Sequence, residues 1–196
     1  MLHRLSKRIA ESLLAKQCFA QEDLDIYIYG TELVLSSALG MSMILVLSVL
    51  FSALAEGLVF LASFILLRAY TGGYHCYTYV KCNTLFVCLF ISALLLYRVM
   101  VLHTPAMAAA TGVLLLLGGG AVLLRYAPVE HPNKPLGKKH RRRCRAVALC
   151  LYAGMGMAAV FLEYFGETLG FMLALVLGQV SALMLCEKYS QRRKNV

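Results

Sequence analysis

Residues 68–82 read RAYTGGYHCYTYVKC, a polar stretch that is broken by a pair of glycines and lies between two apolar runs. It contains an arginine, a histidine and two cysteines at a place where the flanking sequence predicts lipid. Ionisable side chains at such a depth cost free energy, so their presence indicates a functional site. The chain on either side consists of further apolar runs separated by short polar breaks.

The composition of the whole chain is that of an integral membrane protein. Of the 196 residues, 60% are hydrophobic and 15% are charged, whereas about 25% are charged in a typical soluble domain. Several apolar runs approach or exceed the roughly 18 residues that indicate a membrane span. The net charge of +9 is attributed to basic residues that gather on the cytoplasmic side, and we expect no nucleic-acid partner.

Six apolar runs predict an all-α polytopic membrane protein with six transmembrane helices. They cover about 33–54, 58–67, 83–96, 106–124, 146–162 and 168–186. The second run is short, so the polar stretch is expected to complete it as a re-entrant or interfacial segment. With both termini inside, only Arg98 of the 19 basic residues falls outside. This distribution predicts a multi-pass protein of the cell membrane whose termini and polar stretch face the cytoplasm.

We divide the chain into three parts. Residues 1–29 are predicted to form an amphipathic helical segment that lies at the membrane interface; an ordinary surface helix is the alternative. Residues 30–187 form the six-span membrane domain, which includes the polar segment 68–82 and a basic cytoplasmic loop at 127–145. Residues 188–196 form a basic cytoplasmic tail. The basic loop is expected to bind anionic lipid and fix topology, or else to meet an acidic peptide.

His75 and Cys82 are the candidate catalytic pair, with a structural role as the alternative. On a continuous helix the two residues would lie roughly 10 Å apart along the axis, which is too far for a thiol–imidazole contact. The glycines at 72 and 73 predict a break that returns the imidazole to Cys82 near the start of the next helix, where the thiolate is favoured. Cys76 and Cys88 are the competing thiols. The seven cysteines contain no CxxC pair, and we expect no metal or other cofactor.

Two motifs together resemble one known family. The pattern Arg68-x4-Gly73-x-His75-x6-Cys82, after a short second span, is similar to the active-site motif of the accessory gene regulator B (AgrB) family. The later YAPV at 126–129, followed by NKP at 133–135 and a basic run, resembles the central loop of that family. The length, six spans, amphipathic start and basic tail agree, so the resemblance covers essentially the whole chain.

The resemblance implies a membrane cysteine endopeptidase that processes a peptide pheromone precursor for quorum sensing in Gram-positive bacteria. Cys82 would be the nucleophile and His75 the general base. Arg68 and Gly73 match further motif positions, and Arg68 would orient the site, meet an acidic part of the precursor, or anchor the helix at the interface. The remaining supporting or substrate-binding candidates are Thr78, Asn83, Thr84 and Lys134. No cofactor is implied.

The implied partner is an AgrD-like precursor with an amphipathic amino terminus and an acidic carboxyl terminus. Cleavage near its carboxyl-terminal side would leave a thioester on Cys82. A thiol or hydroxyl of the precursor would then close a thiolactone or lactone ring, and exclusion of water would favour ring closure over hydrolysis. A non-enzymatic membrane peptide exporter or partner is the alternative function. Small residues on the fourth apolar run permit a homodimer.

Overall fold

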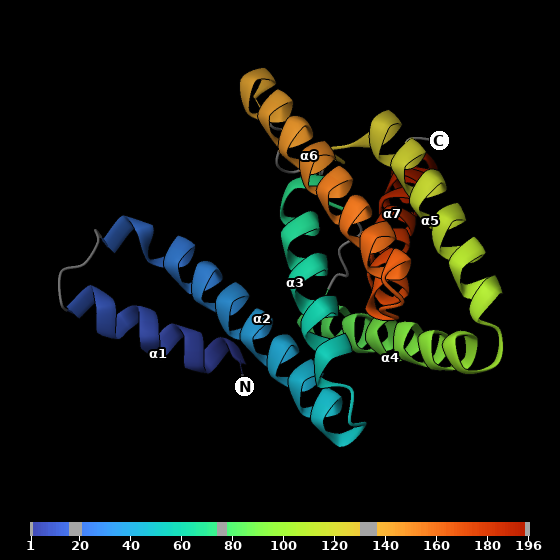
Figure 1. Cartoon of the computed structure of the whole chain (residues 1–196). Helices are drawn as coiled ribbons and strands as arrows, with labels where there is room; N and C mark the ends of the chain where they lie inside the picture. Colours follow the sequence, from blue (N-terminus) through green and yellow to red (C-terminus); the bar gives the residue numbers. More distant parts are fainter. Residues whose placement is uncertain (1, 16–20, 74–77, 130–136, 195–196) are drawn as a thin grey trace.

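The computed structural model describes residues 2–15, 21–73, 78–129 and 137–194 (Figure 1). Within these ranges the chain is almost entirely helical and forms no β-strand. Its elements, in chain order, are α1 (Leu2–Ala15), the 3₁₀ turn η1 (Gln21–Asp23), α2 (Leu24–Leu50), α3 (Leu54–Thr71), α4 (Tyr79–His103), α5 (Pro105–Tyr126), α6 (Lys138–Tyr164) and α7 (Leu169–Lys194). The prediction of an all-α fold is confirmed.

In the described part of the chain, six helices are long and apolar enough to cross a membrane, and they are α2 to α7. The predicted number of spans is therefore confirmed, and the protein is a multi-pass membrane protein. α2 begins at Leu24, inside the stretch assigned from sequence to the amino-terminal segment. α3 continues past the second apolar run to Thr71 and reaches 18 residues, because the cationic Arg68 is compatible with the last turn of a helix.

The centre of the bundle is α7. In an apolar stretch of 18 residues within α7, 67% of the residues are buried inside the protein. The buried fraction of the equivalent stretch is between 17% and 39% in the other spans. It packs against α3, α4, α5 and α6, and in Figure 1 it lies behind α6 and between α3 and α5. α1 runs alongside the first half of α2, and its small residues Ser6 and Ala10 are buried.

Close helix approaches in the bundle depend on glycines. A Cβ on Gly57 of α3 would lie 1.9 Å from the hydroxyl oxygen of Ser48 on α2, so these helices can pack only with glycine there. Gly112 and Gly119 of the fourth apolar run face side chains of α6 and α7 in the same chain. The small-residue face predicted on α5 therefore serves packing within the protomer at these two positions.

An aromatic cluster joins α3 to α4. It thereby fixes the relative position of the two helix ends between which the polar segment runs. Phe60 and Phe64 of α3 contact Phe86 of α4, and the ring centroids of Phe60 and Phe90 are 5.3 Å apart in an edge-to-face arrangement. Such pairs contribute about 0.5–1.5 kcal/mol beyond the area they bury. The cluster fixes the end of α3 relative to the start of α4.

Candidate functional site

The polar segment begins with the predicted break at the paired glycines. α3 ends at Thr71, and the backbone leaves the helix at Gly72 (φ 66°, ψ −152°) and Gly73 (φ 132°). These conformations are essentially restricted to glycine. His75 lies in the stretch 74–77, outside the described residues, together with Cys76. The return of the imidazole to Cys82 therefore stays a prediction.

Arg68 and Gly73, two positions of the first motif, lie against each other. A Cβ on Gly73 would lie 2.9 Å from Nη1 of Arg68, so a side chain there would displace the guanidinium. The guanidinium carbon of Arg68 also lies 5.7 Å from the centroid of the Phe64 ring, close enough for a cation–π contact. The half-buried Arg68 thus packs between the aromatic cluster and the backbone that leads to the predicted histidine.

The structure brings the two sequence motifs together. Gly72 forms an isolated parallel β-bridge with Val129 of the YAPV stretch, and the Val129 amide donates a hydrogen bond of 2.9 Å to the Thr71 carbonyl. A Cβ on Gly72 would lie 2.4 Å from the carbonyl oxygen of Val129. The polar segment is therefore tied to the start of the central loop through backbone atoms.

Cys82 lies in the first turns of α4, as expected. Thr78 is the N-cap: its hydroxyl accepts a hydrogen bond of 3.3 Å from the Lys81 amide, and its carbonyl accepts one of 3.0 Å from the Cys82 amide. A threonine in this position satisfies amides at the helix start that have no partner within the helix. The half-buried thiol of Cys82 is thereby held close to a helix amino terminus.

The other supporting candidates are distributed over different surroundings. Asn83 packs against α2, since its side-chain oxygen would lie 3.2 Å from a Cβ on Gly40. Thr84 is exposed on α4. Lys134 lies outside the described residues. The described structure thus packs Arg68 against Gly73 and joins Thr78 to the Cys82 amide by a hydrogen bond, while Asn83 faces another helix.

A polar contact that sequence reasoning missed holds the start of α4. The Tyr79 hydroxyl donates a hydrogen bond of 3.0 Å to one carboxylate oxygen of Glu32 on α2, and the other oxygen lies 2.5 Å from Nδ1 of His3 on α1. The Glu32 side chain is only 14% exposed. The sequence showed only that a carboxylate, Glu32, lies at the edge of an apolar run. It did not indicate that Tyr79 and His3 are the partners of this carboxylate.

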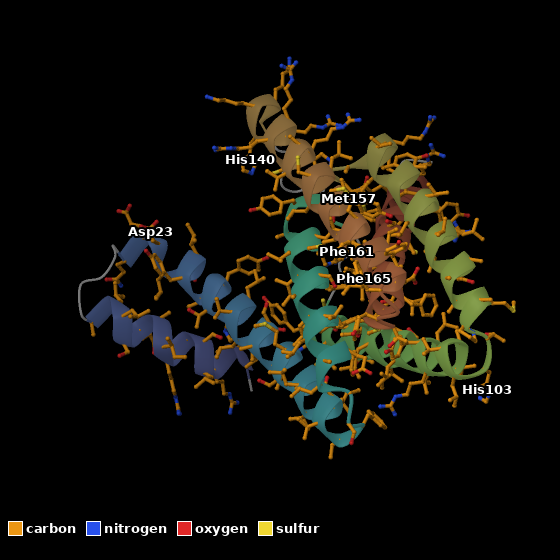
Figure 2. The ribbon with its side chains drawn as sticks, viewed as in Figure 1. Asp23, His103, His140, Met157, Phe161 and Phe165 are labelled. Atoms are coloured by element: carbon orange, nitrogen blue, oxygen red, sulfur yellow. The ribbon has the colours of Figure 1, made fainter. Side chains whose placement is uncertain are left out.

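A thiol–imidazole contact that sequence reasoning did not identify lies on α6. The Cys144 thiol and Nε2 of His140 are 3.5 Å apart, one helical turn from each other, and Figure 2 shows His140 among nitrogen-bearing side chains at the amino-terminal end of α6.

The thiols of Cys82, Cys88, Cys144, Cys150 and Cys186 are free. In the ranges that the structure describes, no three His, Cys, Asp or Glu side chains gather in a way that would hold a metal ion.

A basic pocket of about 450 Å³ opens beside the bridge between Gly72 and Val129. Its lining side chains come from the ends of α5 and α7, the start of α6 and the YAPV stretch, and they are Arg125, Tyr126, Pro128, Val129, Arg141, Lys188 and Gln191. We call this site the basic pocket. Three of its residues are cationic, and no carboxylate is among the described residues that line it.

Comparison with known proteins identifies the family. The family model described as accessory gene regulator B matches residues 6–186. AgrB-like protein 2 of Clostridium perfringens (strain 13 / Type A) is 25% identical over 170 residues, which cover 84% of this chain and 79% of that protein. An AgrB-like protein of Clostridium perfringens (strain SM101 / Type A) is 25% identical over 187 residues, with 91% and 87% coverage.

No solved structure significantly matches the chain. The family match covers α2 to α6, the greater part of α7 and both motifs, including the junction between Gly72 and Val129. The resemblance suggested by the motifs is thereby confirmed, and the chain belongs to the accessory gene regulator B (AgrB) family.

Proposed function

We propose that this protein is a membrane-embedded cysteine endopeptidase that cleaves a pheromone precursor of the AgrD kind and promotes its cyclisation. Membership of the AgrB family supports a role in quorum sensing and a peptide precursor as substrate. The observation that carries the cysteine mechanism is the position of Cys82, half-buried one turn into α4 and directly after a glycine-broken segment. The thiolate is the form of a cysteine that attacks a carbonyl carbon.

The proposed reaction has two steps. His75 takes the thiol proton, and the Cys82 sulfur forms a bond with the carbonyl carbon of a peptide bond near the carboxyl-terminal side of the precursor. The carbon–nitrogen bond breaks, His75 returns the proton to the leaving amine, and a thioester remains on Cys82. A thiol or hydroxyl of the precursor then attacks the thioester, closes a thiolactone or lactone ring and regenerates the Cys82 thiol.

The energetics of this scheme require no ATP. Exchange of the thioester on Cys82 for a thioester within the precursor is nearly isoenergetic, so ring closure by a precursor thiol needs no input of free energy. Release of the cleaved segment drives the reaction forward. Water competes for the same thioester, and the partial burial of Cys82 limits that competition. Arg68 is proposed to position the backbone that leads to His75, because its guanidinium packs against Gly73.

We place the site at the cytoplasmic face of the cell membrane. If the six spans cross the membrane in alternating directions, the end of α3, the start of α4, both ends of the YAPV-to-α6 connection and the end of α7 all fall on the same side. Most of the basic residues lie at that side, as the positive-inside rule requires of a cytoplasmic surface.

The decisive experiment compares two cysteines. Wild-type protein and the Cys82→Ala, His75→Ala and Cys144→Ala variants are reconstituted in nanodiscs with a synthetic precursor that has an amphipathic start, a central cysteine and an acidic end. Cleavage is followed by mass spectrometry, and a peptidyl thioester on the protein is sought at early times. Cys144→Ala is the matched control, because its thiol already contacts an imidazole.

We expect loss of cleavage by at least about 10³-fold for Cys82→Ala and His75→Ala, as for other nucleophile–base pairs that act as a unit. Cys144→Ala should cleave at the wild-type rate. Thermal unfolding of each variant serves as the folding control. Cleavage retained by folded Cys82→Ala would reject the mechanism, and transport of uncleaved peptide that is indifferent to both substitutions would favour the exporter.

A further inference from the structure

A carboxylate on α2 contacts α4 one helical turn before Cys82. We propose that Glu32 is a positioning residue for the Cys82 thiol, because its carboxylate ties Tyr79 at the start of α4 to α2 and, through His3, to α1. In this role Glu32 does not touch the substrate. The consequence for catalysis rests on the proposed function, whereas the effect of Glu32 on the position of Cys82 does not.

The argument starts from the surroundings of the carboxylate. Glu32 lies within the membrane-spanning helix α2, and its side chain is only 14% exposed. An ionisable side chain on such a helix costs free energy unless it is paired, and it marks a functional position by default. Both carboxylate oxygens have partners: the Tyr79 hydroxyl donates a hydrogen bond of 3.0 Å to one, and Nδ1 of His3 lies 2.5 Å from the other. One carboxylate therefore joins three helices.

The first turn of α4 is otherwise weakly packed. Thr78, Val80 and Lys81 are exposed, and Val80 keeps 76% of its surface accessible. The aromatic cluster holds α4 from Phe86 onward, two turns after Tyr79. A helix end with few packed side chains opens locally at a small cost in free energy. The hydrogen bond from Tyr79 to Glu32 therefore restrains a turn that would open readily without it.

The spacing along α4 connects this restraint to the thiol. Tyr79 and Cys82 are three residues apart, so they occupy neighbouring positions on the helix surface. Asn83, four residues after Tyr79, packs against Gly40 of α2. Tyr79 and Asn83 thus both contact α2, and together they set the rotation of the turn that carries Cys82.

The catalytic consequence follows from this geometry. When the Tyr79 hydroxyl loses its acceptor, the first turn of α4 is free to open or rotate, and the Cys82 sulfur no longer has a fixed position. A displacement of about 1 Å at a reacting atom can lower a rate about 10²-fold. Glu32 therefore acts on the proposed nucleophile through Tyr79, and His3 supports it by holding the second carboxylate oxygen from α1.

The test combines turnover with a readout of Cys82 alone. The full chain and its Glu32→Ala, Glu32→Gln, Tyr79→Phe and His3→Ala variants are reconstituted in nanodiscs, and kcat and KM are measured with the synthetic precursor of the cleavage assay. The rate of maleimide labelling of Cys82 is measured for the same substitutions in a background without the other cysteines. Thermal unfolding shows that each variant is folded.

Two matched controls remove the same chemical groups elsewhere. Glu11→Gln removes an exposed carboxylate that lies 3.9 Å from Lys7 on the same helix, α1. Tyr164→Phe removes the hydroxyl of a tyrosine that is 84% exposed at the end of α6. Both controls should turn over the precursor and label at Cys82 as the wild type does.

We expect Glu32→Ala and Tyr79→Phe each to lower kcat by at least about tenfold, the factor for loss of one hydrogen bond to a charged group. KM should not change, because a misplaced nucleophile slows the chemical step without weakening peptide binding. Cys82 should label faster in both variants, since opening of the first turn of α4 exposes it. Glu32→Gln keeps an acceptor for the Tyr79 hydroxyl and should fall between the wild type and Glu32→Ala. His3→Ala should have a smaller effect in the same direction.

The outcomes separate the alternatives. A lower unfolding temperature with unchanged kcat and unchanged labelling would show a merely structural contact and overturn the proposal, as would a rise in KM at constant kcat. If the wild type itself does not cleave the precursor, the peptidase mechanism fails, but the labelling rates still decide whether Glu32 positions Cys82. If Glu32→Ala does not fold, Tyr79→Phe decides the question, because it removes only the hydroxyl and keeps the ring.

Discussion

Replacement of Gly72 by alanine tests whether the junction of the two motifs holds the polar segment in place. Gly72 has φ 66° and ψ −152°, a region essentially confined to glycine in which another residue costs about 1–3 kcal/mol. The new Cβ would also lie 2.4 Å from the carbonyl oxygen of Val129. That oxygen belongs to the backbone, so the bridge must open, and the hydrogen bond from the Val129 amide to the Thr71 carbonyl is lost.

The magnitude follows from these two effects. The lost backbone hydrogen bond contributes about 1 kcal/mol, so the bridged conformation becomes less favourable by roughly 2–4 kcal/mol in total. This corresponds to a population, and hence a cleavage rate, that is lower by roughly 30- to 1000-fold. The helices of the bundle do not depend on the bridge, so the unfolding temperature should change little.

The assay compares Gly72→Ala with Gly154→Ala in α6. A Cβ on Gly154 would have no atom within 4 Å, and alanine is slightly favoured within a helix. Cleavage of the synthetic precursor, maleimide labelling of Cys82 in a background without the other cysteines, and thermal unfolding are measured for both. If Gly72→Ala cleaves as fast as Gly154→Ala and labels at the same rate, the junction does not organise the site and our reasoning is wrong.

Two further predictions concern stability. Tyr79→Phe should lower the free energy of unfolding by about 1 kcal/mol through loss of its hydrogen bond to Glu32. In a Glu32→Gln background the same substitution should lower the free energy of unfolding clearly less. A double-mutant cycle measured by denaturant unfolding that shows no coupling between the two residues would contradict the contact. Gly170→Ala should destabilise the fold by about 1–3 kcal/mol, because its Cβ would lie 2.4 Å from the Ala159 carbonyl oxygen. Gly118→Ala, whose Cβ meets nothing within 4 Å, is the control, and equal unfolding temperatures for the two would refute this prediction.

Local signals account for what could be predicted about this protein. Hydropathy identified the six spans because the free energy of moving a side chain into lipid depends mainly on that side chain. The paired glycines located the end of α3 because steric limits on φ and ψ act within one residue. The same kind of local reasoning placed Cys82 near a helix start, where Thr78 supplies the cap.

Contacts between distant segments could not be read in this way. Val129 meets Gly72, and Glu32 meets Tyr79, because whole helices pack in one particular arrangement. Asn83 was a candidate for the reacting centre, yet it faces α2, since the rotation of α4 is set by the aromatic cluster and by packing on its neighbours. Spacing along the chain carries no information about such rotations.

The sequence by itself therefore determined the class of protein, the number of spans, the helix break and the family motifs. Only the tertiary structure decided that the two motifs join through one backbone bridge, and that Arg125, Arg141 and Lys188 surround one pocket. The physical reason is that transfer free energies and backbone preferences are properties of single residues. Helix packing is a collective property, governed by which small and large side chains fit against one another around α7.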